Sequence, residues 1–447
     1  MTRDTFHLWA YSLNEQVFLG ETVITRFVEI FVLLSLALCA YALYVKWSNG
    51  NAWDLRDGTT RESAMLNPYK GLDWKTVKRV PSATHMHCQT QNTLDNGYRY
   101  GIRHFPVSNY YPSAPYDANT RYSDFTLRQS WPVKRNGELI EPPINWNEVI
   151  TWQDELDERV RARLPFGETG LAFTEIPDDI ILSHNAEHHG FTNSSAHICS
   201  PGSSFASGTF DVKGREYRLK EHGIPIGFGG TWQEAFRGMI RDLDDPAGGG
   251  IVICHPTWFS RLKDSEVLAM LDFDERVLGI EIFNHGMVER DWSERGNPPG
   301  ETEIGFSLHL WDRILSTGRR CWAFCVPDHA VQKGRDWTGR CILLVPDFTE
   351  SECLRAYRNG SFYGCLMDNG LTVTDFHASD TEVSVKTSRS AKIMFITNEG
   401  LAHTATGTSA AYLIPIADGK PAIVYVRVEI SDDTGERLFL QPVMYNH

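Results

Sequence analysis

The stretch Gly249-Gly-Ile-Val-Ile-Cys-His-Pro-Thr-Trp258 decides the fold. Its apolar run at 251–254 is short and follows three consecutive glycines. A run without polar alternation predicts a strand buried on both faces, as in a parallel sheet or barrel covered by helices. Active residues in such folds lie at the carboxyl ends of strands. His255, which ends this strand directly before Pro256, is therefore a candidate site residue.

The same texture continues on both sides of this stretch. Upstream, Thr231 and Glu234 form a capping box that opens an amphipathic helix. Short apolar strands that alternate with amphipathic helices predict an α/β fold. Further strands are predicted at 277–283, 321–326 and 342–345, and helices at 264–271, 307–317 and from Thr349 to about Gly360.

The pattern of apolar and polar residues changes after about residue 370. Runs such as VSVKT at 383–387 and AIVYVRVEI at 422–430 are strand-like, and Asp433-Thr434-Gly435 reads as a hairpin turn. We expect residues 371–447 to form an antiparallel β-sandwich without chemistry of its own.

The amino-terminal part contains one strongly apolar segment. Residues 27–45 carry a single charge, Glu29, over about the length that crosses a bilayer. We expect a transmembrane helix, with a buried core helix and a cleaved signal peptide as the alternatives. The lipid bilayer would then be a partner, and the protein a single-pass membrane protein whose side is undecided, because basic residues flank the segment on both sides. We expect a polar segment over 1–26, a tether over 46–80 and an insertion at about 110–178.

Bulk composition limits the remaining function classes. The 447 residues predict two or three structural units. A formal net charge of −14, without any run of Lys and Arg, argues against nucleic-acid binding. The nine cysteines include no C-x-x-C pair, so we expect buried free thiols rather than a zinc ribbon or a disulfide framework.

Potential metal ligands recur at predicted strand ends. His85 and His87 are two residues apart, so on a strand both imidazoles point to the same face. Each cluster taken singly also fits a solvated loop or a core histidine, but several strand ends that deliver His, Asp or Glu predict a multinuclear Zn, Mn or Fe site. The other clusters are Glu187 with His188, His189 and His197, then His255, Glu281, and Asp328 with His329.

The order of these motifs resembles the PHP family of polymerase and histidinol-phosphatase phosphoesterases. H-x-H is followed by Glu and His, then by an apolar strand ending in His-Pro, then by one ending in Asp beside His. The resemblance covers about residues 80–370 and includes GGIVICHPTW, LGIEIFNHG, LWDRILSTGRRCWAFCVPDHA and LRAYRNGSFYG. It implies a distorted (β/α)7 barrel over 81–370 with a metal cluster at its strand ends.

The resemblance also implies roles for the candidate residues. His85 and His87 would bind the first ion, and Glu187 would bridge ions. Two or three divalent ions (Zn, Mn or Fe) would activate water against a small phosphorylated substrate. The remaining ligands would be His197, His255, Asp328 and His329, and the residues with catalytic roles Glu187, His255 and Asp328.

Three positions depart from the family pattern. Val107-Ser108-Asn109 stands where the family has Thr-Asp-His, Asp95 matches an expected Asp only loosely, and Asp328-His329-Ala330 replaces Asp-x-His. His188 or His189 could substitute for a lost ligand. The alternative function is therefore a degenerate PHP fold that binds a ligand or acts as a scaffold at a membrane. Hydrolysis of a non-phosphate bond and the oligomeric state stay open.

Overall fold

The computed structural model divides the chain into two compact units, residues 1–62 and 63–447. All described residues belong to the second unit. The structure describes residues 65–88, 91–108, 133–135, 138–140, 176–189, 191–203, 205, 231–257, 262–288, 305–333 and 338–445.

A five-stranded sheet carries the apolar strands that the sequence predicts. Its order is β10-β9-β8-β7-β6, with β8, β9 and β10 parallel and the last two strands antiparallel. Every residue of β8, β9 and β10 is buried. The strands are β6 (Glu187–His188), β7 (His197–Cys199), β8 (Ile251–Cys254), β9 (Val277–Asn284) and β10 (Trp322–Val326).

Both faces of this sheet are covered, which explains the continuous apolar runs. Ile253 and Val277 pack in one cluster with side chains of α6 (Trp232–Arg241), α7 (Asp264–Leu271) and α9 (Leu308–Leu315). Their strand neighbours Val252 and Leu278 point the other way, into a second cluster with β11 (Arg340–Val345) and α10 (Glu350–Asn359). Successive strand residues alternate between the faces, so most positions of a strand covered on both sides are apolar.

The helix boundaries follow the capping signals in the sequence. Thr231 caps α6 in a complete capping box with Glu234. Thr349 caps α10, which ends at Gly360 in the left-handed conformation with φ 73°. Both predictions are confirmed. The described chain also contains the short helix α2 (Gln91–Arg99).

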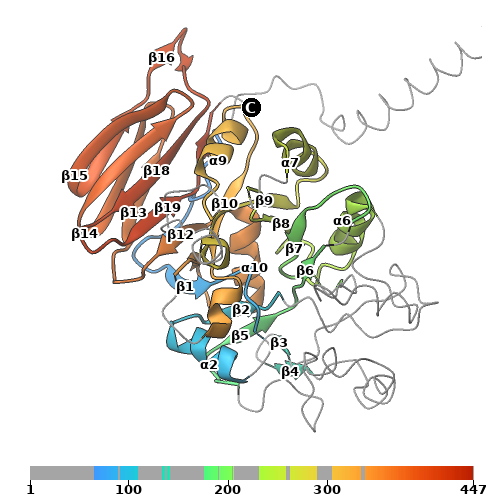
Figure 1. Ribbon diagram of the computed structural model, residues 1–447. Helices are drawn as coiled ribbons and strands as arrows, with labels where there is room; N and C mark the ends of the chain where they lie inside the picture. The colour runs from blue at the N-terminus through green and yellow to red at the C-terminus, as the bar shows by residue number, and fades with distance from the viewer. Residues whose placement is uncertain are drawn as a thin grey trace, which may run out of the picture. The chain divides into compact units, whose positions relative to one another are not determined.

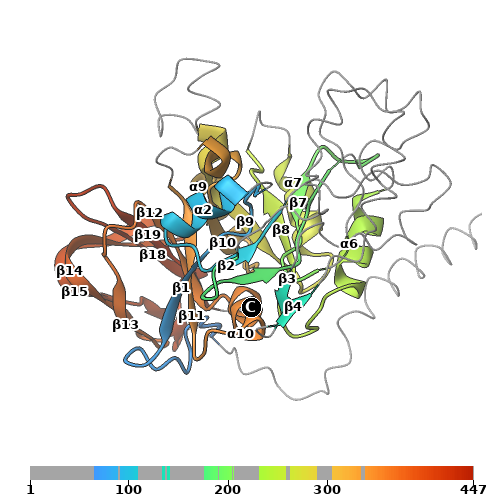
Figure 2. The same ribbon diagram turned by 90° about the horizontal axis from the view of Figure 1, so that it is seen from below.

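An eleven-stranded sheet contains the remaining long strands (Figures 1 and 2). In it, β1 is antiparallel to β11 and parallel to β2, which is parallel to β5. This part of the sheet consists of β1 (Lys78–Ser82), β2 (His104–Pro106), β5 (Ile181–Ser183), β11 (Arg340–Val345) and β12 (Phe362–Leu366).

Main-chain hydrogen bonds join the two sheets at the strand ends. The Asp328 N–H, after β10, donates to the His85 carbonyl at 2.9 Å, after β1. Ser108 N–H donates to Met86 O at 3.1 Å, and Glu187 N–H donates to Ser108 O at 3.2 Å. The candidate ligands after β1, in β6 and after β10 are thus held side by side. The fold is mixed α/β with large sheets and few helices, whereas the distorted (β/α)7 barrel that the resemblance implies stays a prediction.

The C-terminal strands differ from the separate sandwich that the sequence predicts. They are antiparallel as expected, but β19 pairs with β12, so they extend the eleven-stranded sheet. The apolar pattern fixes which faces are buried, whereas the unpaired edge of β12 decides where the next strand attaches. A separate sandwich is therefore not confirmed. These strands are β13 (Val373–Ala378), β14 (Glu382–Thr397), β15 (Gly400–Leu413), β18 (Tyr425–Ser431), β19 (Arg437–Leu440) and β20 (Val443–Met444), with the short pair β16 (Ile416–Ala417) and β17 (Lys420–Pro421).

Two amino-terminal predictions need correction or restriction. The segment 27–45 lies outside the described residues, and no helix in the described chain is long and apolar enough to cross a membrane. This finding contradicts the predicted single-pass membrane localisation. Residues 66–80, expected within a tether, instead join the fold, because Leu66 bridges to Met444 and β1 begins at Lys78. Of the predicted insertion, the described part includes a short hairpin of β3 (Val133–Arg135) and β4 (Glu138–Ile140).

An ion-pair network links the C-terminal strands to α9. The buried Arg427 guanidinium donates to both oxygens of Asp312, at 2.6 and 2.8 Å, and also to Glu429. It lies 4.8 Å from the ring centroid of Trp311. One side chain of β18 thus pairs with two acidic groups, one of them on α9.

We predict that Arg427→Met lowers the free energy of unfolding by about 3 kcal/mol, because it removes a buried guanidinium from the partly buried Asp312 and from the buried Glu429, which then keeps only Arg437 as an ion-pair partner. Urea unfolding of the full chain measures this. The control is Lys386→Met, which breaks the exposed Lys386–Asp375 pair and should cost at most about 1 kcal/mol. Equal losses for the two variants would contradict the assigned role of Arg427.

Candidate metal centre

His85 and His87 follow β1 and bring their imidazoles together in the interior. Both side chains are fully buried, and their Nε2 atoms lie 3.2 Å apart. The i, i+2 spacing places both rings on one side of an extended chain, as the sequence predicts. Two nitrogens at this separation would need either a shared proton or a shared ion between them.

Glu187 and Asp328 complete a group of four donor atoms with these two histidines. Glu187 Oε2 lies 3.1 and 3.0 Å from Nε2 of His85 and His87, and Asp328 Oδ1 lies 3.3 and 3.2 Å from the same atoms. Donors bound to one ion at about 2.0–2.2 Å are about 2.8–3.1 Å apart at right angles and about 3.3–3.6 Å apart at tetrahedral angles. The observed separations fit one divalent ion held by His85, His87 and Glu187, and Asp328 Oδ1 lies beside the same two nitrogens.

A second group uses the other oxygen of Glu187. Glu187 Oε1 lies 2.6 Å from His197 Nδ1 and 3.5 Å from His255 Nε2. These three residues offer ligand atoms within 4.8 Å of one another. One buried carboxylate therefore stands between two sets of imidazoles, in the arrangement expected of a ligand that bridges two ions.

Asp328 and His255 both adopt backbone conformations that L-residues rarely occupy. Their φ angles are 53° and 26°, and only Met367 and Asp418 share positive φ among the described non-glycine residues. Such conformations cost about 1–3 kcal/mol each and persist where surrounding structure enforces them. Asp328 Oδ2 is also buried without a hydrogen-bond partner among the described residues. Strain and an unsatisfied carboxylate oxygen both indicate a site built for a ligand.

Two further histidines border the site. The His329 ring stacks on His87 with centroids 3.8 Å apart, and its Nε2 lies 3.8 Å from Asp328 Oδ1. The His189 ring stacks on His197 at 4.9 Å. His188 turns away and contacts Ser200 Oγ at 2.9 Å. Of the two residues that could substitute for a lost metal ligand, only His189 therefore lies beside the site. The sequence indicates this, because residues 187 and 189 of an extended chain point to the same face.

Two of the positions that depart from the family pattern, Ser108 and Asp95, make other contacts, and Asn109 lies outside the described residues. Ser108 Oγ accepts a hydrogen bond from the Met86 N–H at 2.8 Å, so this side chain braces the H-x-H segment. Asp95 accepts from Gln91 at 2.7 Å on an exposed part of α2, away from the four-atom group. Neither replaces a metal ligand.

Asn185 is a support that the sequence did not single out. Its amide donates to the carbonyls of Thr84 and Pro106, at 2.6 and 2.8 Å. Its Oδ1 accepts from the N–H groups of Ala186 and Ser200, at 2.9 and 2.8 Å. One buried side chain thus connects the ends of three strands beside His85 and Glu187.

The electrostatics of the group are strongly coupled. Burial opposes a charge on His85, yet the carboxylates of Asp328 and Glu187 together hold the pKa of His85 well above its usual value. Burial likewise opposes the charge on Glu187 and on Asp328, but His85 and the other imidazoles hold the pKa of each carboxyl well below its usual value. Burial lowers the pKa of His189 to about 3 and that of His329 to about 4, so both are neutral at pH 7.

Comparisons with known proteins add little to this geometry. No protein-family model and no curated protein matches the chain. A crystal structure from Bacteroides vulgatus ATCC 8482, described as a two-domain protein containing a predicted PHP-like metal-dependent phosphoesterase, is similar at 11% identity and a TM-score of 0.37. The match covers 86% of this chain and 100% of that one.

We predict that metal binding releases protons, because His85 holds a proton at pH 7 that an ion must displace. Since the pKa of His85 is raised, metal affinity should increase as pH rises from 6 toward 8. Calorimetric titration with Zn²⁺ in two buffers of different ionisation enthalpy measures the released protons. Heats that are identical in both buffers would contradict the prediction.

Proposed function

We propose that this protein is a metal-dependent phosphoesterase that hydrolyses a small phosphate ester with two divalent ions on either side of Glu187. The observation that carries the proposal is the buried Glu187 carboxylate. One of its oxygens meets His85 and His87, and the other meets His197 and His255. A binuclear site of mixed imidazole and carboxylate ligands suits Zn, Mn or Fe.

The residues divide into two proposed ligand sets. His85, His87 and Glu187 Oε2 would hold the first ion, with Asp328 Oδ1 beside the two imidazoles, and Glu187 Oε1, His197 and His255 would hold the second. The ions, when bound, would supply a hydroxide and neutralise charge on the ester. Burial of the ligands excludes bulk water and strengthens each charge interaction there.

His329 and the altered second motif refine this proposal. The side chain of His329 is 37% exposed, so it reaches both the site and solvent. Its neutral imidazole can donate one hydrogen bond to a bound phosphate oxygen. Ser108 stands where the family has the Asp of Thr-Asp-His and accepts a hydrogen bond from the Met86 main chain, so we do not propose it as a ligand. The proposal assigns catalysis to residues 81–370, in a distorted barrel closed through the bonds at the strand ends.

We predict that the full chain, incubated with Mn²⁺ or Zn²⁺, hydrolyses a generic phosphomonoester or diester, and that His87→Ala lowers the rate by at least about 100-fold. The loss follows because removing a ligand to a catalytic ion removes more than altering its surroundings, which typically costs 10–100-fold. Release of the leaving group, followed by absorbance, measures the rate.

The matched control is His377→Ala, which removes an exposed histidine from β13 and should leave the rate unchanged. Absence of bound metal and of turnover with either ion would overturn the proposal. Two bound ions without turnover of any phosphate ester would instead favour a ligand-binding module.

A further inference from the structure

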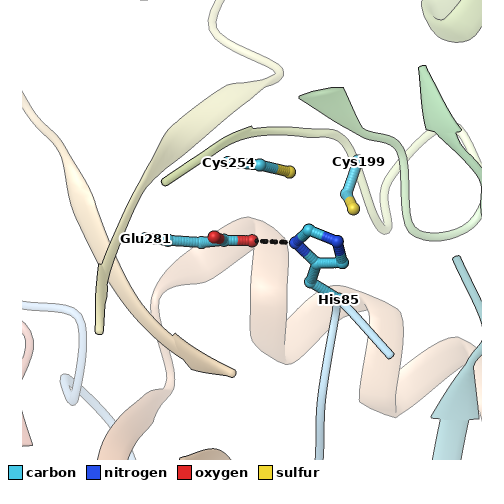
Figure 3. A group of neighbouring side chains, drawn as sticks. All are labelled: His85, Cys199, Cys254 and Glu281. Carbon is cyan, nitrogen blue, oxygen red and sulfur yellow. Dashed lines mark hydrogen bonds and ion pairs between the residues drawn. The ribbon is translucent and has the colours of Figure 1, made fainter. Parts of the chain in front are cut away.

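Glu281 is a buried acid in the middle of β9, where every other side chain of the strand except Asn284 is apolar or glycine. Its Oε1 lies 2.7 Å from His85 Nδ1. Figure 3 marks this contact with a dashed line. Its Oε2 accepts hydrogen bonds from the His255 main-chain N–H at 2.7 Å and from Asn284 Nδ2 at 2.9 Å. Glu281 thus contacts a residue from each proposed ligand set.

The first contact determines which nitrogen of His85 faces the ion. A carboxylate only accepts hydrogen bonds, so His85 must donate from Nδ1. Once an ion displaces the second proton of His85, the lone pair is on Nε2, the atom that lies near Glu187 and Asp328. A carboxylate behind a metal-binding imidazole fixes the ring orientation and raises its basicity.

The second contact holds the main chain of His255. This residue has a φ of 26°, and its N–H points at Glu281 Oε2. A main-chain donor held by a carboxylate makes a stronger bond than a neutral pair, which offsets part of the backbone strain. The bond therefore orients the residue that brings Nε2 to the other oxygen of Glu187.

The two thiols beside Glu281 compete only weakly with His85 Nδ1 for a hydrogen bond to its carboxylate. The thiols of Cys199 and Cys254 lie beside Glu281 and His85, with ligand atoms of all four within 4.8 Å of one another (Figure 3). Burial is the main reason that the pKa of Cys254 is raised well above its usual value, so this thiol is neutral. A neutral thiol is a weak donor and a weak acceptor, and the low-polarity contact strengthens the bond from imidazole to carboxylate.

We propose that Glu281 is the positioning residue of the metal centre: one oxygen sets the tautomer of His85, and the other sets the backbone of His255. This inference rests on the binuclear site of the proposed function. Glu281 is not itself a ligand in this assignment, because its two oxygens are occupied by three donors.

The test is Glu281→Gln, which keeps the size of the side chain and reverses the direction of the hydrogen bond with His85 Nδ1. The two donors at Oε2 demand the amide oxygen there, so the amide NH₂ faces His85 Nδ1. The proton of His85 must then move to Nε2, where it blocks the first ion. We expect zinc affinity at one of two sites to fall about 10- to 100-fold, with the other site changed less. Competition with a chromophoric chelator measures both constants.

Two controls separate positioning from folding. Asn284→Ala removes one donor but leaves His85 donating, so its zinc affinities should stay within about threefold of the wild type. Glu436→Gln alters another buried glutamate, one that accepts from Leu371 N–H, and should leave both constants unchanged. If Asn284→Ala loses as much affinity as Glu281→Gln, or if Glu281→Gln binds zinc like the wild type, the inference is overturned.

The zinc-loaded wild-type crystal structure tests the inference without a substitution. Zinc on His85 Nε2, with Glu281 outside the coordination sphere and still on Nδ1, supports it. A Glu281 oxygen bound to zinc overturns it while leaving a metal-dependent function intact. A wild-type chain that binds no metal refutes the proposed function instead.

Discussion

The rest of the structure depends on one constraint, the burial of the Glu187 carboxylate among imidazoles. A buried carboxylate without compensation is expensive, and here Asp328 adds a second negative group 3.2–3.3 Å from the same histidine nitrogens. Protonated imidazoles balance this charge in the metal-free chain, and divalent ions would balance it better. The same carboxylate contacts His197 and His255 through its second oxygen. The net charge of both ligand sets therefore depends on Glu187.

The fold serves this constraint by bringing strand ends together. Main-chain bonds link the segments of His85, Ser108, Glu187 and Asp328 into adjoining positions, although these residues are far apart in sequence. These main-chain bonds hold Asp328 in its strained backbone conformation. Asn185 and Glu281 add side-chain hydrogen bonds to the main chain, and the bond from Glu281 holds the strained His255. Rigid support of this kind keeps donors within the tolerance that metal coordination requires.

The sequence predicted the parts of the fold that local patterns determine. Largely apolar runs located β8, β9 and β10, because burial on two faces leaves few polar positions. Capping residues located the starts of α6 and α10, because they satisfy helix N–H groups that otherwise have no partner. The expectation that active residues lie at strand ends also identified most of the candidate ligands that the structure brings together. The attachment of β19 to β12 was not predictable, since an open sheet edge has no side-chain signature. His189 and Asn185 were equally hard to assign, because their roles depend on which neighbouring segments the fold brings to them.

The number of ions bound per chain tests the central claim most directly. The full-length protein is loaded with Mn²⁺ or Zn²⁺, freed of excess ion and assayed by elemental analysis beside Glu187→Gln. Because both ligand sets share the Glu187 carboxylate, the account predicts two ions in the wild type and fewer than one in the variant. A wild-type chain without bound metal, or a variant that retains both ions, would contradict it.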